Sequence, residues 1–157
     1  KMEILRKLLA SLKADRVLVF INTSEAIGET AMKLNYHGIA AAGLHGSSVK
    51  SDRQEALEAF RAGKVKVLVA SDLAARGLDI SDVACIVNLE LPEAPQAYLH
   101  RAGRTGRAGQ KGLVVSIVER QEEKQIAGLQ KKLQIRLLPK HMARGKIVDG
   151  LDQANKQ

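Results

Sequence analysis

Residues 17–21 read Val-Leu-Val-Phe-Ile, an uninterrupted apolar run that is typical of a β-strand buried on both faces. Similar runs occur at Val65–Ala70, Val83–Leu89 and Leu113–Val118, and an alanine-rich one occurs at Ile39–Leu44. Strands that are apolar on both sides belong to parallel sheets that are covered by helices. The sequence therefore predicts a buried, mostly parallel sheet.

Helical patterns separate these strands. Leucines at 5, 8, 9 and 12 follow helical spacing, Ser24 can cap a second helix, and Ser51 with Gln54 forms a capping box for a third. We expect helices at about residues 3–13, 24–36, 51–60, 94–101 and 120–133. Strands that alternate with helices of this length predict parallel β-α-β units, and hence an α/β domain with helices on both faces of the sheet.

The composition suits one domain with an aliphatic core. The 157 residues are 45% apolar but only 3% aromatic, and no apolar run approaches the roughly 20 residues of a membrane span. The single cysteine, Cys85, excludes an internal disulfide and a cysteine-based zinc site, and we expect it to be a buried strand residue. No hydrophobic signal segment opens the sequence, so a cytoplasmic location is expected.

The positive charge lies in the second part of the chain. Residues 1–97 carry twelve Lys and Arg against twelve Asp and Glu, whereas residues 98–157 carry thirteen against five, which gives the whole net charge of +8. Such a distribution favours an anionic partner, most often nucleic acid or nucleotide. A solvated helix face with a basic tail is an equally good interpretation of charge alone.

The basic residues concentrate in residues 100–107, which read His-Arg-Ala-Gly-Arg-Thr-Gly-Arg. A core-facing helix needs apolar residues every three or four positions, and this block has only one small apolar residue. Its glycines let the backbone approach a partner, and its arginines present planar forks that match phosphate oxygens. We interpret the block as a phosphate-binding surface and rank a merely solvated basic turn well behind.

Polar residues follow three of the predicted strands, at Asn22-Thr23, His45-Gly46 and Ser71-Asp72. Ligands of parallel sheets bind where the carboxyl ends of the strands meet. The Ser71 hydroxyl and nearby amides can hold a phosphate there, and Asp79 can accept a hydrogen bond from a ribose hydroxyl. A local ion pair between Asp72 and Arg76 is the structural alternative.

Arg53 lies in the first turn of the expected third helix, where the backbone amides also attract a phosphate. An exposed arginine that pairs with a neighbouring acid explains its position equally well. The sequence of residues 46–51 is similar to part of a nucleotide-binding P-loop, but Val49 occupies the position at which that loop requires glycine. The chain therefore has no triphosphate cradle of its own. We also predict no metal site, because His37 is expected at the surface near a helix end and His141 lies in the basic tail.

In chain order, five segments resemble the signature motifs of the DEAD-box RNA helicases. Residues 17–23 resemble motif IV, and His45-Gly46 with Arg53 resemble the segment before motif V. Residues 70–79 resemble motif V, and residues 87–92 resemble the element that follows it. Residues 100–107 resemble motif VI. The resemblance covers about residues 3–135. It implies the C-terminal RecA-like domain of such a helicase, a three-layer α/β fold.

The resemblance also implies roles for single residues at the ATP site. Arg104 and Arg107 match two arginine fingers that reach the terminal phosphates of ATP bound to the first domain, and phosphoryl transfer responds strongly to positioned positive charge. His100 matches a residue that links the ATP site to the acidic motif of that other domain. Gly77 and Asp79 match positions near the ribose.

A second set of positions matches residues that line the RNA backbone, namely Asn22, Thr23, Gly46, Arg53 and Ser71. Contacts with phosphates and sugar hydroxyls carry little base specificity. The implied cofactor is ATP with Mg²⁺, both held mainly by an N-terminal RecA-like domain outside this chain. That domain and single-stranded or duplex RNA are the implied partners, no membrane is involved, and the oligomeric state stays open.

The implied mechanism is closure of the cleft between the two domains on ATP and RNA, which bends the bound strand and separates a short duplex. We place the helicase domain at residues 1–138 and a basic polar tail, or the start of a C-terminal extension, at residues 139–157. The chain departs from the family pattern at Lys50, where Gln is usual, at Ser71, where Thr is usual, and at Glu90, where Asp is commoner.

Two rival functions remain at this point. One is a helicase or translocase of the wider superfamily that acts on DNA. The other is a non-enzymatic basic α/β module that docks on nucleic acid.

Overall fold

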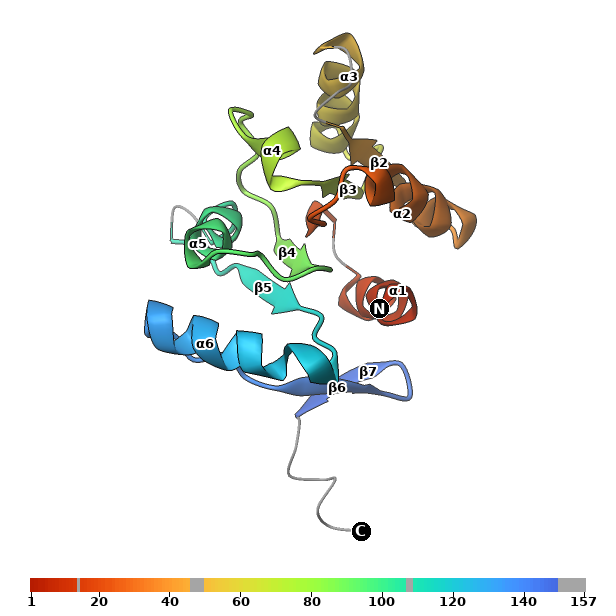
Figure 1. Cartoon of the computed structure of the whole chain (residues 1–157). Helices are drawn as coiled ribbons and strands as arrows, with labels where there is room; N and C mark the ends of the chain where they lie inside the picture. The colour runs from red at the N-terminus through yellow and green to blue at the C-terminus, as the bar shows by residue number, and fades with distance from the viewer. Residues whose placement is uncertain (14, 46–49, 107–108, 150–157) are drawn as a thin grey trace.

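The central sheet has five strands, all parallel to their neighbours. The computed structural model describes residues 1–13, 15–45, 50–106 and 109–149. The strands are β1 (Val17–Phe20), β2 (Ala41–Leu44), β3 (Val67–Ala70), β4 (Cys85–Asn88) and β5 (Leu113–Ser116), in the order β2-β3-β1-β4-β5. Each of the four pairings is parallel, which confirms the predicted parallel sheet (Figure 1).

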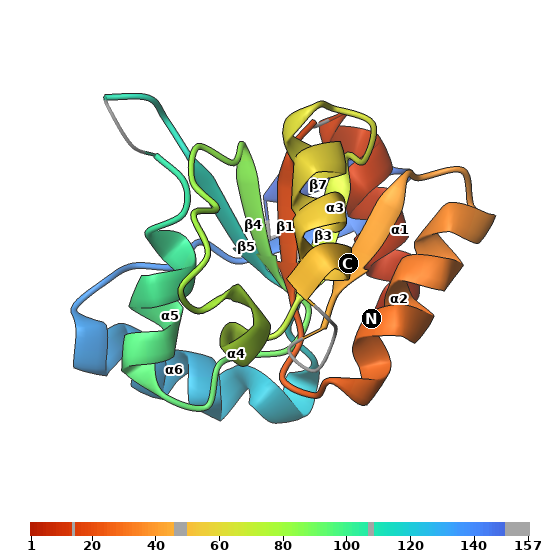
Figure 2. The same ribbon diagram turned by 90° about the horizontal axis from the view of Figure 1, so that it is seen from above.

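Alternate residues of each strand pack into two separate apolar layers. Val17 and Val19 pack with residues of α1 (Met2–Leu12) and α2 (Glu25–Tyr36), whereas Leu18 and Phe20 pack with residues of α3 (Lys50–Arg61) and α4 (Asp72–Ala75). Figure 2 shows the sheet between its helices. Each such aliphatic side chain contributes about 1.5–3 kcal/mol when it is fully buried. The predicted three-layer α/β fold is confirmed.

The same strand order brings the polar strand ends together. β1 is the middle strand, and its last residue, Phe20, is in register with Ala70 of β3 and with Asn88 of β4. The residues that follow these three strands therefore meet at one edge of the sheet, which we call the carboxyl edge. In the sheet, β2 and β3, which follow β1 in the chain, lie on one side of β1, and β4 lies on its other side. The carboxyl edge at this reversal of strand order holds the crevice in which such sheets bind ligands.

Local differences from the predicted elements have local causes. A one-turn helix, α4, follows β3 because the Ser71 hydroxyl caps it by accepting a hydrogen bond from the Ala74 amide at 3.2 Å. The expected capping box at Ser51 is wrong, because α3 already includes Lys50 and Ser51 lies inside the helix. The segments after these are α5 (Pro95–Ala102), a 3₁₀ turn η1 (Arg120–Glu122) and α6 (Glu123–Leu133).

Residues 140–149 form a hairpin where the sequence analysis expects a polar tail. Its strands, β6 (Lys140–Ala143) and β7 (Lys146–Asp149), are antiparallel and are joined by Arg144 and Gly145, both with positive φ. That two-residue turn matches the twist of a hairpin, but Arg-Gly lacks the usual Asn-Gly or Asp-Gly signal. Ile147 packs against the apolar layer of α1. The division of the chain at residue 138 stays a prediction.

Candidate functional site

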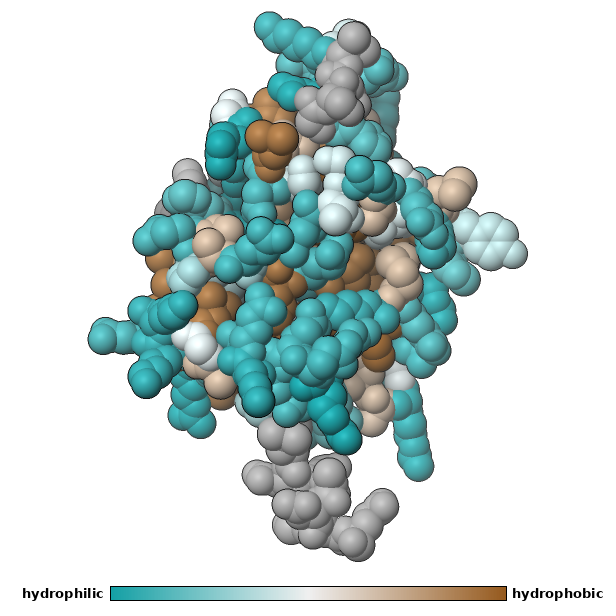
Figure 3. Space-filling model, in the orientation of Figure 1, coloured by the Kyte–Doolittle hydropathy of each residue, from teal (hydrophilic) through white to brown (hydrophobic). Residues whose placement is uncertain are grey.

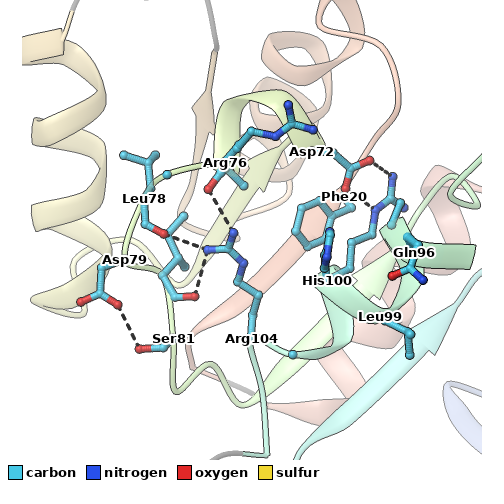
Figure 4. Close-up of a pocket in the computed structure, with 16 residues that line it drawn as sticks. Phe20, Asp72, Arg76, Leu78, Asp79, Ser81, Gln96, Leu99, His100 and Arg104 are labelled. Carbon is cyan, nitrogen blue, oxygen red and sulfur yellow. Dashed lines mark hydrogen bonds and ion pairs between the residues drawn. The ribbon is translucent and has the colours of Figure 1, made fainter. Parts of the chain in front are cut away.

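A surface pocket of about 810 Å³ lies at the carboxyl edge, between the loop after α4 and helix α5. The loop contributes residues 75–81 to its wall, and α5 contributes Gln96, Leu99 and His100. Figure 4 shows these side chains around the pocket, with Arg104 between the loop and the helix. The structure therefore brings together residues that are 20 or more positions apart in the chain, including most of those that the sequence analysis assigned to ATP.

Arg104 binds the loop through its guanidinium group. Nη1 donates to the carbonyl oxygens of Leu78 at 2.9 Å and Ile80 at 3.3 Å, and Nη2 donates to that of Ala75 at 3.1 Å. The side chain is half-buried and lines the pocket. Neutral carbonyls are weaker partners for a guanidinium than anionic oxygens are, so an anion in the pocket can compete for these donors.

The loop that Arg104 holds also carries Gly77 and Asp79, the predicted ribose contacts. Gly77 has φ of 76°, a conformation that side chains rarely adopt, although a Cβ there would meet no atom within 4 Å. Asp79 is exposed and accepts a hydrogen bond from the Ser81 hydroxyl, while Arg61 of α3 donates to the Asp79 carbonyl at 2.7 Å. The loop is thus held by Arg61 of α3 and by Arg104, which follows α5, and it keeps the Asp79 carboxylate at the surface.

Arg101 is the most deeply buried charged residue of this edge, with 1% of its surface exposed. Its Nε and Nη2 donate to the two Asp72 carboxylate oxygens at 2.8 and 2.7 Å. Further bonds reach Asn22, Asn88 and the carbonyl of Glu90, and the guanidinium lies 4.9 Å from the centre of the Phe20 ring, as a cation–π contact.

Arg101 has a separate role that the sequence pattern did not reveal, because all three arginines of the basic block resemble phosphate ligands. The one available signal was its helical register: Arg101 lies three residues after the buried Tyr98, on the inward side of α5. Asp72, for which a local pair with Arg76 was the alternative, binds Arg101 instead.

The residues assigned to RNA lie partly at this same edge. Asn22 donates to the Leu91 carbonyl at 2.8 Å and accepts from Arg101, so its side chain is engaged within the protein. Thr23 is exposed beside it, and Ser71 is buried as the cap of α4. Among the residues that the structure describes, the buried Nε of Arg53 has no hydrogen-bond partner.

Two predicted site residues, Arg107 and Gly46, lie outside the described residues. The segment just before Arg107 is anchored to the sheet, since the Thr105 hydroxyl donates to the Val83 carbonyl and Thr105 forms a parallel bridge with Val83. Gly112 crosses it so closely that a Cβ at Gly112 would lie 2.5 Å from the Gly106 amide nitrogen. Thr105 and Gly106 are therefore held closely against the sheet and Gly112.

Over residues 1–13, 15–45, 50–106 and 109–149, no cluster of three or more His, Cys, Asp or Glu side chains is arranged to hold a metal ion. Over the same ranges, none of the helices has the length and apolar character to span a membrane.

Comparison with known proteins assigns this architecture to a family. Residues 1–109 match the family described as the helicase conserved C-terminal domain. The DEAD-box ATP-dependent RNA helicase CshC of Bacillus cereus is 39% identical over 142 residues, which are 90% of this chain and 36% of that protein. CshA of Bacillus subtilis is 39% identical over 130 residues, 26% of its length. The chain therefore spans about a third or less of these relatives.

Solved structures agree with this assignment. A DEAD-box protein from Methanococcus jannaschii superposes with a TM-score of 0.80 at 36% identity, over 86% of this chain and 37% of that one. The Escherichia coli DEAD-box protein SrmB, in a complex with the regulator of ribonuclease activity A, superposes with a TM-score of 0.79 at 39% identity. The match covers 83% of this chain and 77% of that one. The chain belongs to the helicase conserved C-terminal domain family, as the second RecA-like domain of the DEAD-box RNA helicase type.

Proposed function

We propose that this domain works as one lobe of an ATP-dependent RNA helicase, with an N-terminal RecA-like lobe as its partner. The observation that carries the proposal is the pocket at the carboxyl edge, where Arg104, His100 and Asp79 surround one cavity. A guanidinium, an imidazole and a carboxylate suit the phosphates and ribose of a nucleotide held by a facing surface. A relative at 30% identity, Dbp5 of Saccharomyces cerevisiae, has been solved with RNA and ADP-BeF₃.

In this proposal Arg104 exchanges its carbonyl partners for phosphate oxygens when the two lobes close. Arg107, which is six positions after Arg101 in the sequence, supplies the second finger, and His100 faces the other lobe. ATP with Mg²⁺ supplies the transferable phosphoryl group, held mainly by the partner lobe because this chain has no P-loop sequence. The isolated chain therefore hydrolyses no ATP.

The exposed surface of the carboxyl edge suits a partner lobe. Leu73 of α4 is 67% exposed and Leu99 of α5, beside the pocket, is 44% exposed. Figure 3 shows an apolar area at the position of α4 on an otherwise mostly hydrophilic face. Exposed apolar groups within a polar rim are typical of protein–protein contacts. RNA would cross the same edge near Thr23 and Arg53, with contacts to its backbone.

The test is Arg104→Ala in a protein that joins this chain to its N-terminal lobe. We expect the RNA-stimulated kcat for ATP to fall by about a hundredfold or more, because a positioned positive charge is lost from the transition state. Arg136→Ala, which removes an exposed arginine that does not line the pocket, is the matched control. An unchanged kcat would remove Arg104 from the finger role.

The same protein separates the rival functions. An ATPase that responds to DNA as strongly as to RNA would favour the DNA-acting alternative. If Arg104→Ala abolished RNA binding and the unmodified two-lobe protein turned over no ATP, the docking module would be the better description.

A further inference from the structure

The five donors of the Arg101 guanidinium are all used. Nε and Nη2 bind Asp72, Nη2 also binds the Asn22 amide oxygen at 2.8 Å, and Nη1 binds the Asn88 amide oxygen at 3.1 Å and the Glu90 carbonyl at 2.9 Å. A guanidinium has five N–H groups, so none is left over. Such completeness matters because the side chain is fully buried, and burying a charge costs several kcal/mol unless it is paired and hydrogen-bonded.

The acceptors come from three different strands. Asn22 follows β1, Asp72 follows β3, and Asn88 and Glu90 lie at the end of β4. These are the three central strands of the sheet, in the order β3-β1-β4. The last backbone bonds between these segments run from the Ile21 amide to the Ala70 carbonyl and from the Leu89 and Glu90 amides to the Phe20 carbonyl. Beyond them, one side chain of α5 ties the three loops together.

Arg101 also stands between the two proposed ligand sites. The preceding residue on α5 is His100, and Arg104 follows just beyond the end of this helix; both line the pocket. On the opposite side, its partners Asn22 and Asp72 are adjacent in sequence to Thr23 and Ser71, which are assigned to RNA. Any shift of the loops after β1 and β3 must therefore either break hydrogen bonds of a buried charge or move α5 with them.

We propose that Arg101 is a positioning residue that transmits RNA occupancy at the loops after β1 and β3 to the pocket residues on α5. The inference rests on the proposed function and deepens it. Arg101 forms part of the pocket wall, but its side chain has no exposed surface, so the proposal gives it no direct contact with ATP or RNA. Breaking one of its bonds leaves a buried donor unpaired, so the loops and the helix move as one unit. The coupling is thereby cooperative.

The test is Arg101→Lys in the two-lobe protein. Lysine keeps the charge but cannot present five donors in a planar fork, so it cannot hold all three loops. We expect the activation ratio, which is kcat with saturating RNA divided by kcat without RNA, to fall by about tenfold, in the range of typical coupling energies. The RNA concentration for half-maximal activation should rise as well. Arg136→Lys makes the same chemical change at an exposed site and should leave the ratio unchanged.

A merely structural role gives a different result. Partial unfolding would lower both kcat values by the same factor and leave the activation ratio unchanged, and that result overturns the proposal. Asn88→Ala covers the case in which Arg101→Lys does not fold. The substitution at this buried residue removes one of the five Arg101 bonds and the bond that the Asn88 amide donates to the Ser116 hydroxyl, and it leaves the other four Arg101 bonds in place. We therefore expect a folded protein with a ratio reduced by about threefold. An unchanged ratio in folded Asn88→Ala also contradicts the coupling.

The proposed function and this inference fail separately. If the unmodified two-lobe protein shows no RNA-dependent ATPase, the proposed function is wrong. If Arg104→Ala abolishes turnover but Arg101→Lys keeps the full activation ratio, the helicase function stands and only the coupling role of Arg101 is wrong.

Discussion

Two ion pairs of equal length lie at opposite ends of the central strands. Arg101 and Asp72 are 2.7 Å apart at the carboxyl edge, and Lys66 and Asp15 are 2.7 Å apart where β1 and β3 begin. Arg101 has no exposed side-chain surface, and Asp72 is 40% exposed, whereas Lys66 and Asp15 are 54% and 70% exposed. Equal distance therefore does not mean equal energy, because burial decides how much water competes with the pair.

The comparison explains why one end of the sheet suits a ligand and the other does not. At the amino end, the fully buried residues are uncharged, with Val17, Val67 and Cys85 aligned across three strands, and the partly buried Arg16 lies over the Phe60 ring. At the carboxyl edge, a buried charge holds polar loops in place. A fold built only for stability has no need of the second arrangement, since a packed apolar cluster of similar volume is often as stable as a buried ion pair.

The largest effect that we expect at the apolar end concerns Cys85. Burial raises the pKa of its thiol to about 12, from an ordinary value of 9.0, and the side chain is 1% exposed. Three pKa units reduce the reactive thiolate about a thousandfold, so a thiol reagent near neutral pH should label the native chain at least that much more slowly than the urea-unfolded chain. Labelling at similar rates in both states would contradict the burial of this end.

At the carboxyl edge, Asp72→Ala should destabilise the chain by about 3 kcal/mol. The substitution leaves Arg101 buried with its main anionic partner removed, and loss of one member of a buried pair costs about 3–5 kcal/mol. We choose the lower end because the Asp72 carboxylate is partly exposed and three other acceptors remain. Urea unfolding monitored by circular dichroism measures the change, and a loss under about 1 kcal/mol would mean that the pair is effectively solvated.

Asp15→Ala is the matched change at the exposed pair and should have the smallest effect. We expect a loss below about 1 kcal/mol, because exposed ion pairs contribute little and are screened by salt. The same unfolding experiment should show that the loss shrinks further as the salt concentration rises. A loss equal to that of Asp72→Ala would remove burial as the cause of the difference between the two ends.

The sequence allowed much of the site to be predicted, because the carboxyl ends of parallel strands necessarily meet. Asn22 and Ser71 do lie at one edge, and Gly77, Asp79, His100 and Arg104 do surround or border one pocket. Their roles toward ATP and RNA stay predictions, as do those of Arg107 and Gly46, which lie outside the described residues. The pattern of the basic block assigned Arg101 no role of its own, because its three arginines look alike in sequence.

The hairpin of residues 140–149 shows a second limit. Its turn residues, Arg144 and Gly145, carry no strong turn signal, and its strands gain their stability from packing on α1 through Ile147. A two-stranded ribbon is only marginally stable alone, so its sequence need not have a strong pattern when a neighbouring helix covers it.

The pattern of the chain alone determined the parallel sheet, its covering helices and the basic block, because apolar periodicity and charge are local properties that need no partner. Only the tertiary structure decided which arginine is internal and which faces the pocket. Arg101 finds its acceptors at residues between 11 and 79 positions away in the chain. A guanidinium can be buried only where such distant groups converge, and that convergence exists only after the strands have aligned.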